Sequence, residues 1–462
     1  MKSESRTAVH LLAGPALFAA ALAAMPGSRA AAAAIGLTLW MLYWWITRPV
    51  HIAVTALLPI AVNSLAGIAP MDTVLASYFS PIAVLLLGAS LLLAVWSACG
   101  LDQRIAVRAL LLIGPSVRGQ LLVWYWLATL ASMFLPNSVV AAVLCPIAAA
   151  MLRACRADIP ETGSPTRYFI LLAIVWGAGI GGFGTPLGGS MNLVAIRYIE
   201  DFTGAEYSYV TWTLRMAPYL LLLSAGISVY LLLVRLDVGL LPGSRAHFRT
   251  LYAGLGAMGR DQKIALALFL LAVVASFARP LYERLLPGLQ PYYAFLLAGM
   301  AAMLLRSEKG GRLITWEQAA RSVNWGLLLL FSGGMAAGNL ILSSGAAEAV
   351  ARLIGSLSLS AAAVLPVFVM AGILLSNASS NTAATAVLLP VVISVMSLMG
   401  HDPLPMLYPA AAACNCAFVL PTSIRAIPVG YGLDIGFMFR KGWAALLVCL
   451  VLLVVAGLAA VL

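Results

Sequence analysis

Two clusters of hydroxyl and amide side chains interrupt long apolar stretches of this 462-residue chain. The first cluster holds Ser132, Asn137 and Ser138, and the second runs from Ser376 to Thr382. Such side chains are costly in hydrocarbon unless they bind a ligand or one another. Their oxygens suit a small cation such as Na⁺, whereas backbone N–H groups at the starts of half-helices suit an anion. The clusters therefore indicate a small-ion site, and hydrogen bonding between helices is the alternative.

The two clusters belong to an internal repeat, which has to be interpreted before any single motif. The segment SMFLPNSVVAAVLCP (132–146) aligns without gaps on SNASSNTAATAVLLP (376–390), and six positions are identical. Gly88 matches Gly333, and Gly100 matches Gly345, at nearly the same spacing. Shared polar and proline positions favour a true repeat over chance similarity between apolar segments.

Charge indicates how the two copies are oriented. Residues 101–167 carry six basic side chains, whereas residues 346–411 carry only Arg352. Because basic residues gather in cytoplasmic loops, the first hairpin should open to the cytoplasm and the second to the outside. An inverted repeat of this kind is typical of secondary transporters, whose substrate site lies near the midplane where the copies meet.

Composition sets the class of protein, since 63% of the residues are hydrophobic and only 9% are charged. We expect an all-α polytopic membrane protein with about eleven spans and two re-entrant hairpins, which excludes a soluble enzyme and a secreted disulfide scaffold. The expected spans cover residues 8–25, 32–47, 51–69, 80–99, 168–199, 211–234, 264–279, 291–305, 323–343, 404–432 and 442–462. The expected hairpins are 119–151 and 361–397.

Several other functions are disfavoured by the sequence. A net charge of +11 is explained by basic cytoplasmic loops rather than by nucleic-acid binding. The six cysteines are expected to be packing residues, and the four histidines form no metal motif. The hairpins hold no Asp, Glu or His, so an intramembrane enzyme would lack an acid or base. A passive channel is disfavoured because re-entrant tips at a midplane site favour alternating access.

The basic loops also predict orientation and domain organisation. The polar loop 235–263 should be cytoplasmic, with the N-terminus inside and the C-terminus outside the inner membrane. The first segment could instead be a cleaved signal peptide. We expect scaffold helices over 1–79, a first repeat over 80–234, the cytoplasmic loop, scaffold helices and a loop over 264–322, and a second repeat over 323–462.

Each hairpin precedes a span that is broken at its centre. The first broken helix, 168–199, contains GAGIGGFGTPLGGSMN (177–192), and the second, 404–432, contains LPTSIRAIP (420–428). Gly and Pro free backbone groups that must line a cavity or bind ligands. The first segment also fits GxGxxG, but no strand precedes it, so a dinucleotide site is not expected.

With these motifs the sequence resembles the divalent anion/sodium symporter family, in which each of two hairpins carries an SNT motif. Ser380-Asn381-Thr382 is that motif intact, and Pro136-Asn137-Ser138 is a degenerate first copy. Gly184–Asn192 resembles the family's GTPIGTPPN, and Pro421–Ile427 resembles its PVATPPN. The segments WWITRPVHIAVTALLP (44–59) and WGLLLLFSGGMAAG (325–338) are also similar, so the resemblance covers nearly the whole chain.

The resemblance implies an INDY-like dicarboxylate transporter: a homodimer that works by an elevator mechanism, couples Na⁺ to anion uptake and needs no other cofactor. It implies a first Na⁺ site at Ser132, Asn137 and the carbonyls of Pro136 and Gly188. It implies a second at Ser376, Ser379, Asn381 and Ser423. The anion would lie between Asn137-Ser138 and Asn381-Thr382, near Gly189 and Arg425.

Three positions depart from the family pattern. Pro136 replaces a serine, Gly189 replaces a threonine, and Arg425 stands where the family usually has proline. Arginine would add a permanent charge and a planar set of donors for an oxyanion, unless it snorkels or pairs elsewhere. We therefore expect Na⁺-coupled dicarboxylate uptake. The alternative is Na⁺-independent anion exchange or sulfate-type transport, with Arg425 supplying the fixed charge.

Overall fold

In the described part of the chain, every secondary-structure element longer than a single bridge is a helix. The computed structural model describes residues 2–25, 28–47, 49–155, 163–323, 325–346, 360–378, 380–421 and 423–461. Within these ranges no strand is present, and two isolated β-bridges join Ser116 to Leu240 and Arg306 to Arg312. The all-helical class expected from the sequence is therefore confirmed.

Five described helices are long and apolar enough to cross a membrane, judged by length and composition. Seven shorter apolar helices of 10–17 residues accompany them. The exact number of spans, expected to be about eleven, stays a prediction. The five long helices are Met71–Cys99, Asn137–Cys155, Tyr209–Leu233, Asn381–Leu398 and Ile435–Ala460.

The first part of the chain forms a set of helices, and two of its residues, Trp45 and Ile52, line the same cavity as residues of both polar clusters. Helix α1 (Lys2–Ala24) packs against α2 (Arg29–Thr47), and the Trp44 Nε1 donates to the His10 carbonyl at 3.2 Å. Three short helices follow: α3 (Ile52–Ala56), α4 (Leu58–Ala66) and α5 (Met71–Ala76).

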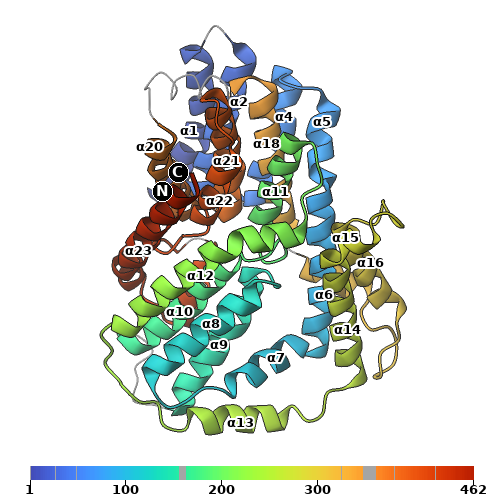
Figure 1. Ribbon diagram of the computed structural model, residues 1–462, viewed down its shortest axis with the longest axis vertical. Helices are drawn as coiled ribbons and strands as arrows, with labels where there is room; N and C mark the ends of the chain where they lie inside the picture. Colours follow the sequence, from blue (N-terminus) through green and yellow to red (C-terminus); the bar gives the residue numbers. More distant parts are fainter. Residues whose placement is uncertain are drawn as a thin grey trace.

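Two of the glycines matched by the repeat allow close helix packing. Helix α6 (Pro81–Cys99) packs against α14 (Arg260–Phe277) and α16 (Pro291–Leu304) (Figure 1). A Cβ on Gly88 of α6 would lie 2.4 Å from the Leu296 nitrogen. Helix α18 (Trp325–Ser343) packs on α3 in the same way, because a Cβ on Gly333 would lie 2.3 Å from the Ala56 oxygen. Only glycine fits at either contact.

Both polar clusters lie at the turn between two helices. Helices α8 (Val117–Ser132) and α9 (Asn137–Cys155) contain the first cluster, and α20 (Ala361–Ala378) and α21 (Asn381–Leu398) contain the second. Asn137 and Asn381, matched by the repeat, are each the first residue of the second helix. The aligned prolines Pro146 and Pro390 lie inside these two helices.

An α-helix precedes each predicted break, but the second ends earlier than the sequence predicts and is followed by 3₁₀ turns rather than by a second α-helical half. Helix α10 (Pro165–Gly181) is followed by an irregular loop and α11 (Ser190–Thr203), as expected. Helix α22 (Leu404–Ala413) stops well before the predicted break at Leu420, and the 3₁₀ turns η2 (Ser423–Ala426) and η3 (Pro428–Tyr431) follow. The loop after α22 is stabilised by a side chain, because the Asn377 Oδ1 accepts hydrogen bonds from the Phe418 and Val419 nitrogens, both at 3.0 Å.

The basic loops gather at one end of the molecule. Helices α7 (Leu101–Leu110) and α13 (Ser244–Gly254) lie at this end (Figure 1), and neither was predicted from the sequence. The Arg104 guanidinium donates to the carbonyls of Leu255, Gly256 and Ala257 at 2.6–3.2 Å. The Ser164 Oγ donates to Asp237 at 2.8 Å, and the pKa of that carboxyl is lowered by hydrogen bonds from Thr166 and Ser164 that outweigh the effect of its burial.

The turns after α11 and after α14 lie beside each other. Arg279, in the short helix α15 (Arg279–Tyr282), forms an ion pair with Glu206 at 3.1 Å. The hydroxyls of Tyr207 and Tyr408 lie 2.6 Å apart, which places α22 beside the turn after α11. Helix α12 (Tyr209–Leu233) leads from this turn to the basic loop 235–263 over 25 residues, which corresponds to roughly 37 Å of helix.

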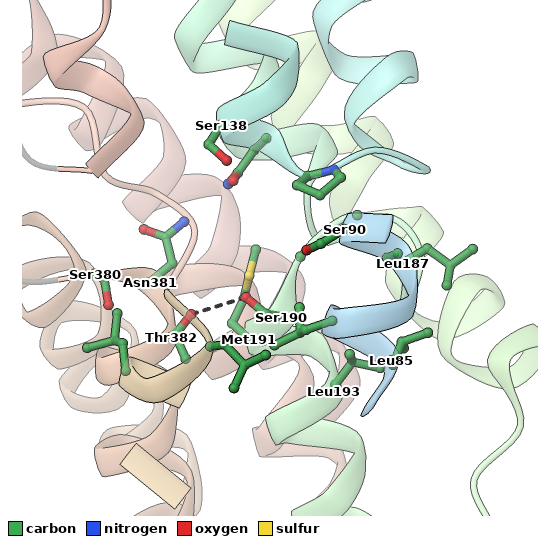
Figure 2. Close-up of a pocket in the computed structure, with 18 of the residues that line it drawn as sticks. Leu85, Ser90, Ser138, Leu187, Ser190, Met191, Leu193, Ser380, Asn381 and Thr382 are labelled. Carbon is green, nitrogen blue, oxygen red and sulfur yellow. Dashed lines mark hydrogen bonds between the residues drawn. The ribbon is translucent and has the colours of Figure 1, made fainter. Parts of the chain in front are cut away.

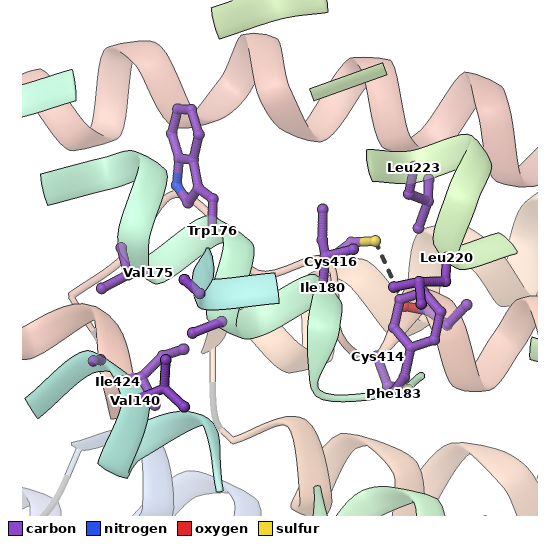
Figure 3. Packing of buried hydrophobic residues seen from close by; sticks show 14 of the residues in the cluster. Val140, Val175, Trp176, Ile180, Phe183, Leu220, Leu223, Cys414, Cys416 and Ile424 are labelled. Carbon is purple, nitrogen blue, oxygen red and sulfur yellow. Dashed lines mark hydrogen bonds between the residues drawn. The ribbon is translucent and has the colours of Figure 1, made fainter. Parts of the chain in front are cut away.

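A core of buried apolar side chains holds the hairpins and the broken helices together. Helix α10 is buried along its length between α8, α9, α12 and the last helix, α23 (Ile435–Val461) (Figure 1). Figure 3 shows Trp176, Ile180 and Phe183 packed against residues of α12 and of the loop after α22. All six cysteines are free, and four are buried. Cys416 donates to the Ala412 carbonyl at 3.5 Å.

Candidate functional site

The two polar clusters meet at one cavity of about 380 Å³. Its wall comes from both hairpin turns, the start of α11, the middle of α6 and the turn η2, together with side chains of α2, α3, α14, α16 and α18 (Figure 2). The polar side chains in the wall are hydroxyls and amides. They are Ser90, Asn137, Ser138, Ser190, Ser380, Asn381 and Thr382.

The first hairpin contributes the start of α9. Pro136, Asn137 and Ser138 all line the cavity. The Pro136 carbonyl accepts hydrogen bonds from Val139 N at 2.9 Å and Val140 N at 3.2 Å, so it already caps the first helical turn. The N–H groups at the start of a helix have no partner within the helix and carry partial positive charge. Asn137 and Ser138 therefore lie where an anion is favoured.

The second hairpin contributes the start of α21 in the same way. Ser380 is the N-cap, and its hydroxyl accepts from Ala383 N at 3.2 Å. Asn381 is only 9% exposed, and its Nδ2 donates to the Asn415 Oδ1 at 3.2 Å. The Asn381 Oδ1 is buried and has no hydrogen-bond partner among the described residues. An unsatisfied buried oxygen is costly, so a cation or a ligand hydroxyl is favoured beside it.

Helix α11 supplies a third helix start. Gly189 is its N-cap, and Ser190 is its first residue. The Ser190 and Thr382 hydroxyls lie 3.5 Å apart across the cavity wall, which links the first repeat to the second (Figure 2). A Cβ on Gly189 would lie 2.3 Å from the Met191 Cε. Met191 therefore occupies the space that a threonine at position 189 would need.

A group of backbone carbonyls faces Gly188 at the edge of the cavity. A Cβ at position 188 would lie 2.3 Å from the Ser132 oxygen, 2.7 Å from the Gly182 oxygen and 3.1 Å from the Met133 oxygen. We call these three oxygens the first carbonyl cradle. Thr185 and Asn192 fix the cradle, since the Thr185 hydroxyl donates to Met133 O and the Asn192 Nδ2 donates to Gly182 O at 2.7 Å. Converging carbonyl oxygens suit a hard cation.

Several predicted site residues lie outside the cavity wall. The Ser132 hydroxyl donates to the Ala178 carbonyl at 2.8 Å, and the Ser376 hydroxyl donates to the Ile373 carbonyl at 3.0 Å. Both serines are fully buried and do not line the cavity. Ser379 and the side chain of Ser423 lie outside the described residues. The structure thus brings together Pro136, Asn137, Ser138, Gly188, Gly189, Asn381 and Thr382.

Arg425 is also absent from the cavity wall. Its neighbours Ile424 and Ile427 line the cavity, whereas the Arg425 side chain is only 2% exposed. Its guanidinium donates to the carbonyls of Leu420, Ala417 and Ser376 at 2.8, 3.1 and 3.3 Å. The expected contact between Arg425 and an anion is therefore not part of this geometry.

Three cavity residues with an oxygen or sulfur atom in the side chain were not singled out from the sequence. Ser90 lies on α6, and Ser190 and Met191 lie at the start of α11. Ser190 and Met191 belong to a motif that was recognised as a break, so their position could have been found. Ser90 is a lone hydroxyl in an apolar helix, and it has no matching residue in the repeat.

The charge of the wall limits what the site can do. No Asp, Glu, Lys, Arg or His is among the described residues that line the cavity. The described residues also contain no group of three or more His, Cys, Asp or Glu that could hold a metal ion. Acid–base catalysis has no side chain to use here. Three helix starts, six Ser, Thr and Asn side chains around them and a carbonyl cradle can instead bind an anion next to a small cation.

Comparisons with known proteins identify transporters as relatives of this chain. A family model described as "CitMHS: Citrate transporter" matches residues 42–413. The sodium-dependent dicarboxylate transporter SdcS of Staphylococcus saprophyticus is 29% identical over 97% of this chain and 90% of its own length. SdcS of Staphylococcus aureus strain USA300 is 30% identical over 91% of this chain and 84% of its own length. The YdaH transporter of Alcanivorax borkumensis has a similar fold, with a TM-score of 0.50 and 13% identity over 84% of this chain and 87% of that chain.

Proposed function

Because the chain belongs to the CitMHS citrate transporter family, we propose that it couples Na⁺ to the movement of a dicarboxylate across the membrane. The family and the relatives are transporters, so the chain is a multi-pass membrane transporter and not an enzyme. The expected resemblance to sodium-dependent dicarboxylate transporters is confirmed by these relatives.

One observation carries the proposal: Asn137 and Asn381, matched by the repeat, begin two helices at the same cavity. An anion bound there lies between the starts of α9, α11 and α21, whose partial positive charges favour it. Since the described wall has no cationic side chain, a bound Na⁺ supplies the remaining positive charge. This requirement couples the two ions.

The cradle beside Gly188 is the Na⁺ site that we favour. It contains the carbonyl of Ser132, and Asn137 and Gly188 line the cavity next to it. Carbonyl and amide oxygens are ligands that hard cations prefer. Pro136, the fourth residue of the proposed site, contributes a carbonyl that also caps α9. The second set of proposed Na⁺ ligands, around Ser376, has a different environment that is described below.

We also propose an elevator movement of a homodimer, in which the hairpins and broken helices slide past the other helices. The distribution of polarity in the cavity supports this proposal. On the side of α6, α14, α16 and α18 the wall is apolar except for Ser90, for example at Leu85, Phe269 and Phe295. The other hydroxyls and amides lie on the hairpins and α11. A ligand held by the hairpins and α11 can therefore move past the apolar side chains of the other helices with few polar contacts to break.

We also propose that the repeat is inverted. The turn before α10 contacts the basic loop 235–263 through Ser164 and Asp237, whereas α22 contacts the turn after α11 through Tyr408 and Tyr207. Helix α12 separates that turn from the basic loop, and this difference supports opposite orientations of the two copies. Gly100 and Gly345, matched by the repeat, both adopt left-handed conformations with φ of 70° and 73°, which supports the repeat itself.

Uptake into proteoliposomes tests the proposal. The purified protein should take up a labelled four-carbon dicarboxylate such as succinate with saturable kinetics when an inward Na⁺ gradient is present. Replacement of Na⁺ by choline should abolish uptake, other dicarboxylates should compete, and monocarboxylates should not. Uptake that is equal with and without Na⁺ would favour an exchanger, and competition by sulfate alone would exclude dicarboxylate transport.

A further inference from the structure

Arg425 satisfies three carbonyl oxygens of the second repeat. These oxygens belong to Ser376 at the end of the first hairpin helix, and to Ala417 and Leu420 in the loop after α22. Carbonyls that lie together in a dry interior repel one another unless a donor or a cation lies between them. The guanidinium is both, because it carries a permanent charge and a planar set of donors.

The first repeat has a similar group of oxygens, two of which accept hydrogen bonds from uncharged side chains rather than from a cationic one. Ser132 is the counterpart of Ser376 in the repeat, and its carbonyl is part of the first carbonyl cradle. The Gly182 oxygen of that cradle lies in the loop that follows α10, as the Ala417 oxygen lies in the loop that follows α22. Position 188, against which the oxygens of the first cradle pack, is glycine and lines the cavity. A cation bound by these oxygens would therefore have to come from solution.

We infer that Arg425 is a tethered cation that occupies the place of one coupling ion, so that only the first repeat binds Na⁺. This inference rests on the proposed Na⁺-coupled function and specifies its stoichiometry. The fixed guanidinium stabilises the second hairpin throughout the transport cycle, whereas the first cradle binds and releases Na⁺. Each anion is then driven by one Na⁺ fewer than it would be with two open cradles.

The number of bound Na⁺ ions tests this inference without any transport. Equilibrium binding of ²²Na⁺ to the purified protein in detergent, with no anion present, gives the number directly. Arg425→Ala leaves the three carbonyls without a cation, so this variant should bind one Na⁺ more than the unmodified protein. Na⁺ should also raise the melting temperature of Arg425→Ala more steeply than that of the unmodified protein.

Arg104→Ala is a matched control. Arg104 is also buried and also donates to three backbone carbonyls, but these belong to the loop 255–257 at the basic end. Its loss should lower the melting temperature while the number of bound Na⁺ stays the same. An extra Na⁺ in both variants would show that any exposed carbonyl group binds the ion, and this would overturn the inference.

Further variants keep the test decisive if Arg425→Ala does not fold. Arg425→Lys keeps the charge and should bind the same number of Na⁺ as the unmodified protein, whereas Gly188→Ala should bind Na⁺ at least tenfold more weakly. The rival arrangement is a second Na⁺ on the buried Asn381 Oδ1. Two Na⁺ in the unmodified protein, with one lost in Asn381→Ala, would establish that rival and overturn the inference. If dicarboxylate uptake fails while Arg425→Ala still gains a Na⁺, only the proposed substrate is wrong.

Discussion

The Asn381 side-chain amide donates to the Asn415 side-chain oxygen at 3.2 Å, and this bond leaves the buried Asn381 Oδ1 without a partner in the described structure. The bond joins the second hairpin to the loop after α22, the two segments that surround Arg425. It also fixes the side chain that begins α21 at the cavity. Asn381 therefore has a fixed orientation and a side-chain oxygen without a partner among the described residues, and both features favour ligand binding.

We predict that Asn381→Ala and Asn137→Ala each reduce dicarboxylate uptake at least tenfold, because each removes an amide from the ligand site. A hydrogen bond to a charged group contributes roughly 1.5–3 kcal/mol, which corresponds to a factor of ten or more. Uptake should be measured at equal abundance in the membrane. Asn339→Ala is the matched control, since Asn339 donates to Ser77 at 3.1 Å and does not line the cavity. Normal uptake by either of the first two variants would remove that asparagine from the site.

The Ser190 and Thr382 hydroxyls should bind the anion together. We expect Ser190→Ala and Thr382→Ala each to raise the KM of uptake severalfold, with a smaller effect on the maximal rate. The double variant should be less impaired than the product of the single effects, since neighbouring residues are not additive. Ser276→Ala is a suitable control, because this buried serine donates to Ala272 within α14 and to Pro291 and does not line the cavity. Strict additivity would indicate that the two hydroxyls do not share a ligand.

The positions of the two asparagines could be predicted from the sequence, but the direction of Arg425 could not. Matched polar residues in two apolar hairpins have few roles besides ligand binding, so the repeat located Asn137 and Asn381. Arg425 lies in η2, a short turn in which no hydrophobic period shows which face meets the cavity. Ile424 and Ile427 line the cavity, and Arg425 faces the other way.

The early end of α22 could not be predicted from the sequence, for a different physical reason. The alanine-rich, apolar segment after Leu404 favours a continuous helix, and nothing in its composition marks Ala413 as the end. Hydrogen bonds from distant parts of the chain determine the end instead. Asn377 and Arg425 bind backbone groups of the loop between Cys416 and Leu420, so tertiary contacts override local propensity.

Gly188→Ala should weaken Na⁺ binding at least tenfold. The new Cβ would meet the Ser132 and Gly182 oxygens at 2.3 and 2.7 Å, and these are backbone atoms that cannot rotate away. The cradle must therefore open. Gly430→Ala provides the control, because a Cβ at that position meets nothing within 4 Å. The effect can be measured as the Na⁺ concentration that gives half-maximal thermal stabilisation. An unchanged value in Gly188→Ala would place the Na⁺ site elsewhere.

Cysteine labelling should show that the two repeats face opposite sides of the membrane. In a background without native cysteines, Glu161→Cys should react with an impermeant maleimide only from the cytoplasm. His401→Cys, at an exposed position after α21, should react only from the outside. The reason is the difference in basic residues between the two repeats. Labelling of both positions from the same side would contradict the inverted repeat.

Because the described cavity wall has no charged side chain, the pH dependence of uptake should come from the substrate rather than from the protein. No described wall residue changes its charge over the physiological pH range. Whether a dicarboxylic acid is accepted then depends on its own ionisation. Uptake of two dicarboxylates with different second pKa values should give pH profiles of the same shape, displaced from each other by the difference between those values. A mildly acidic environment would thus change which nutrients are imported without altering the transporter itself.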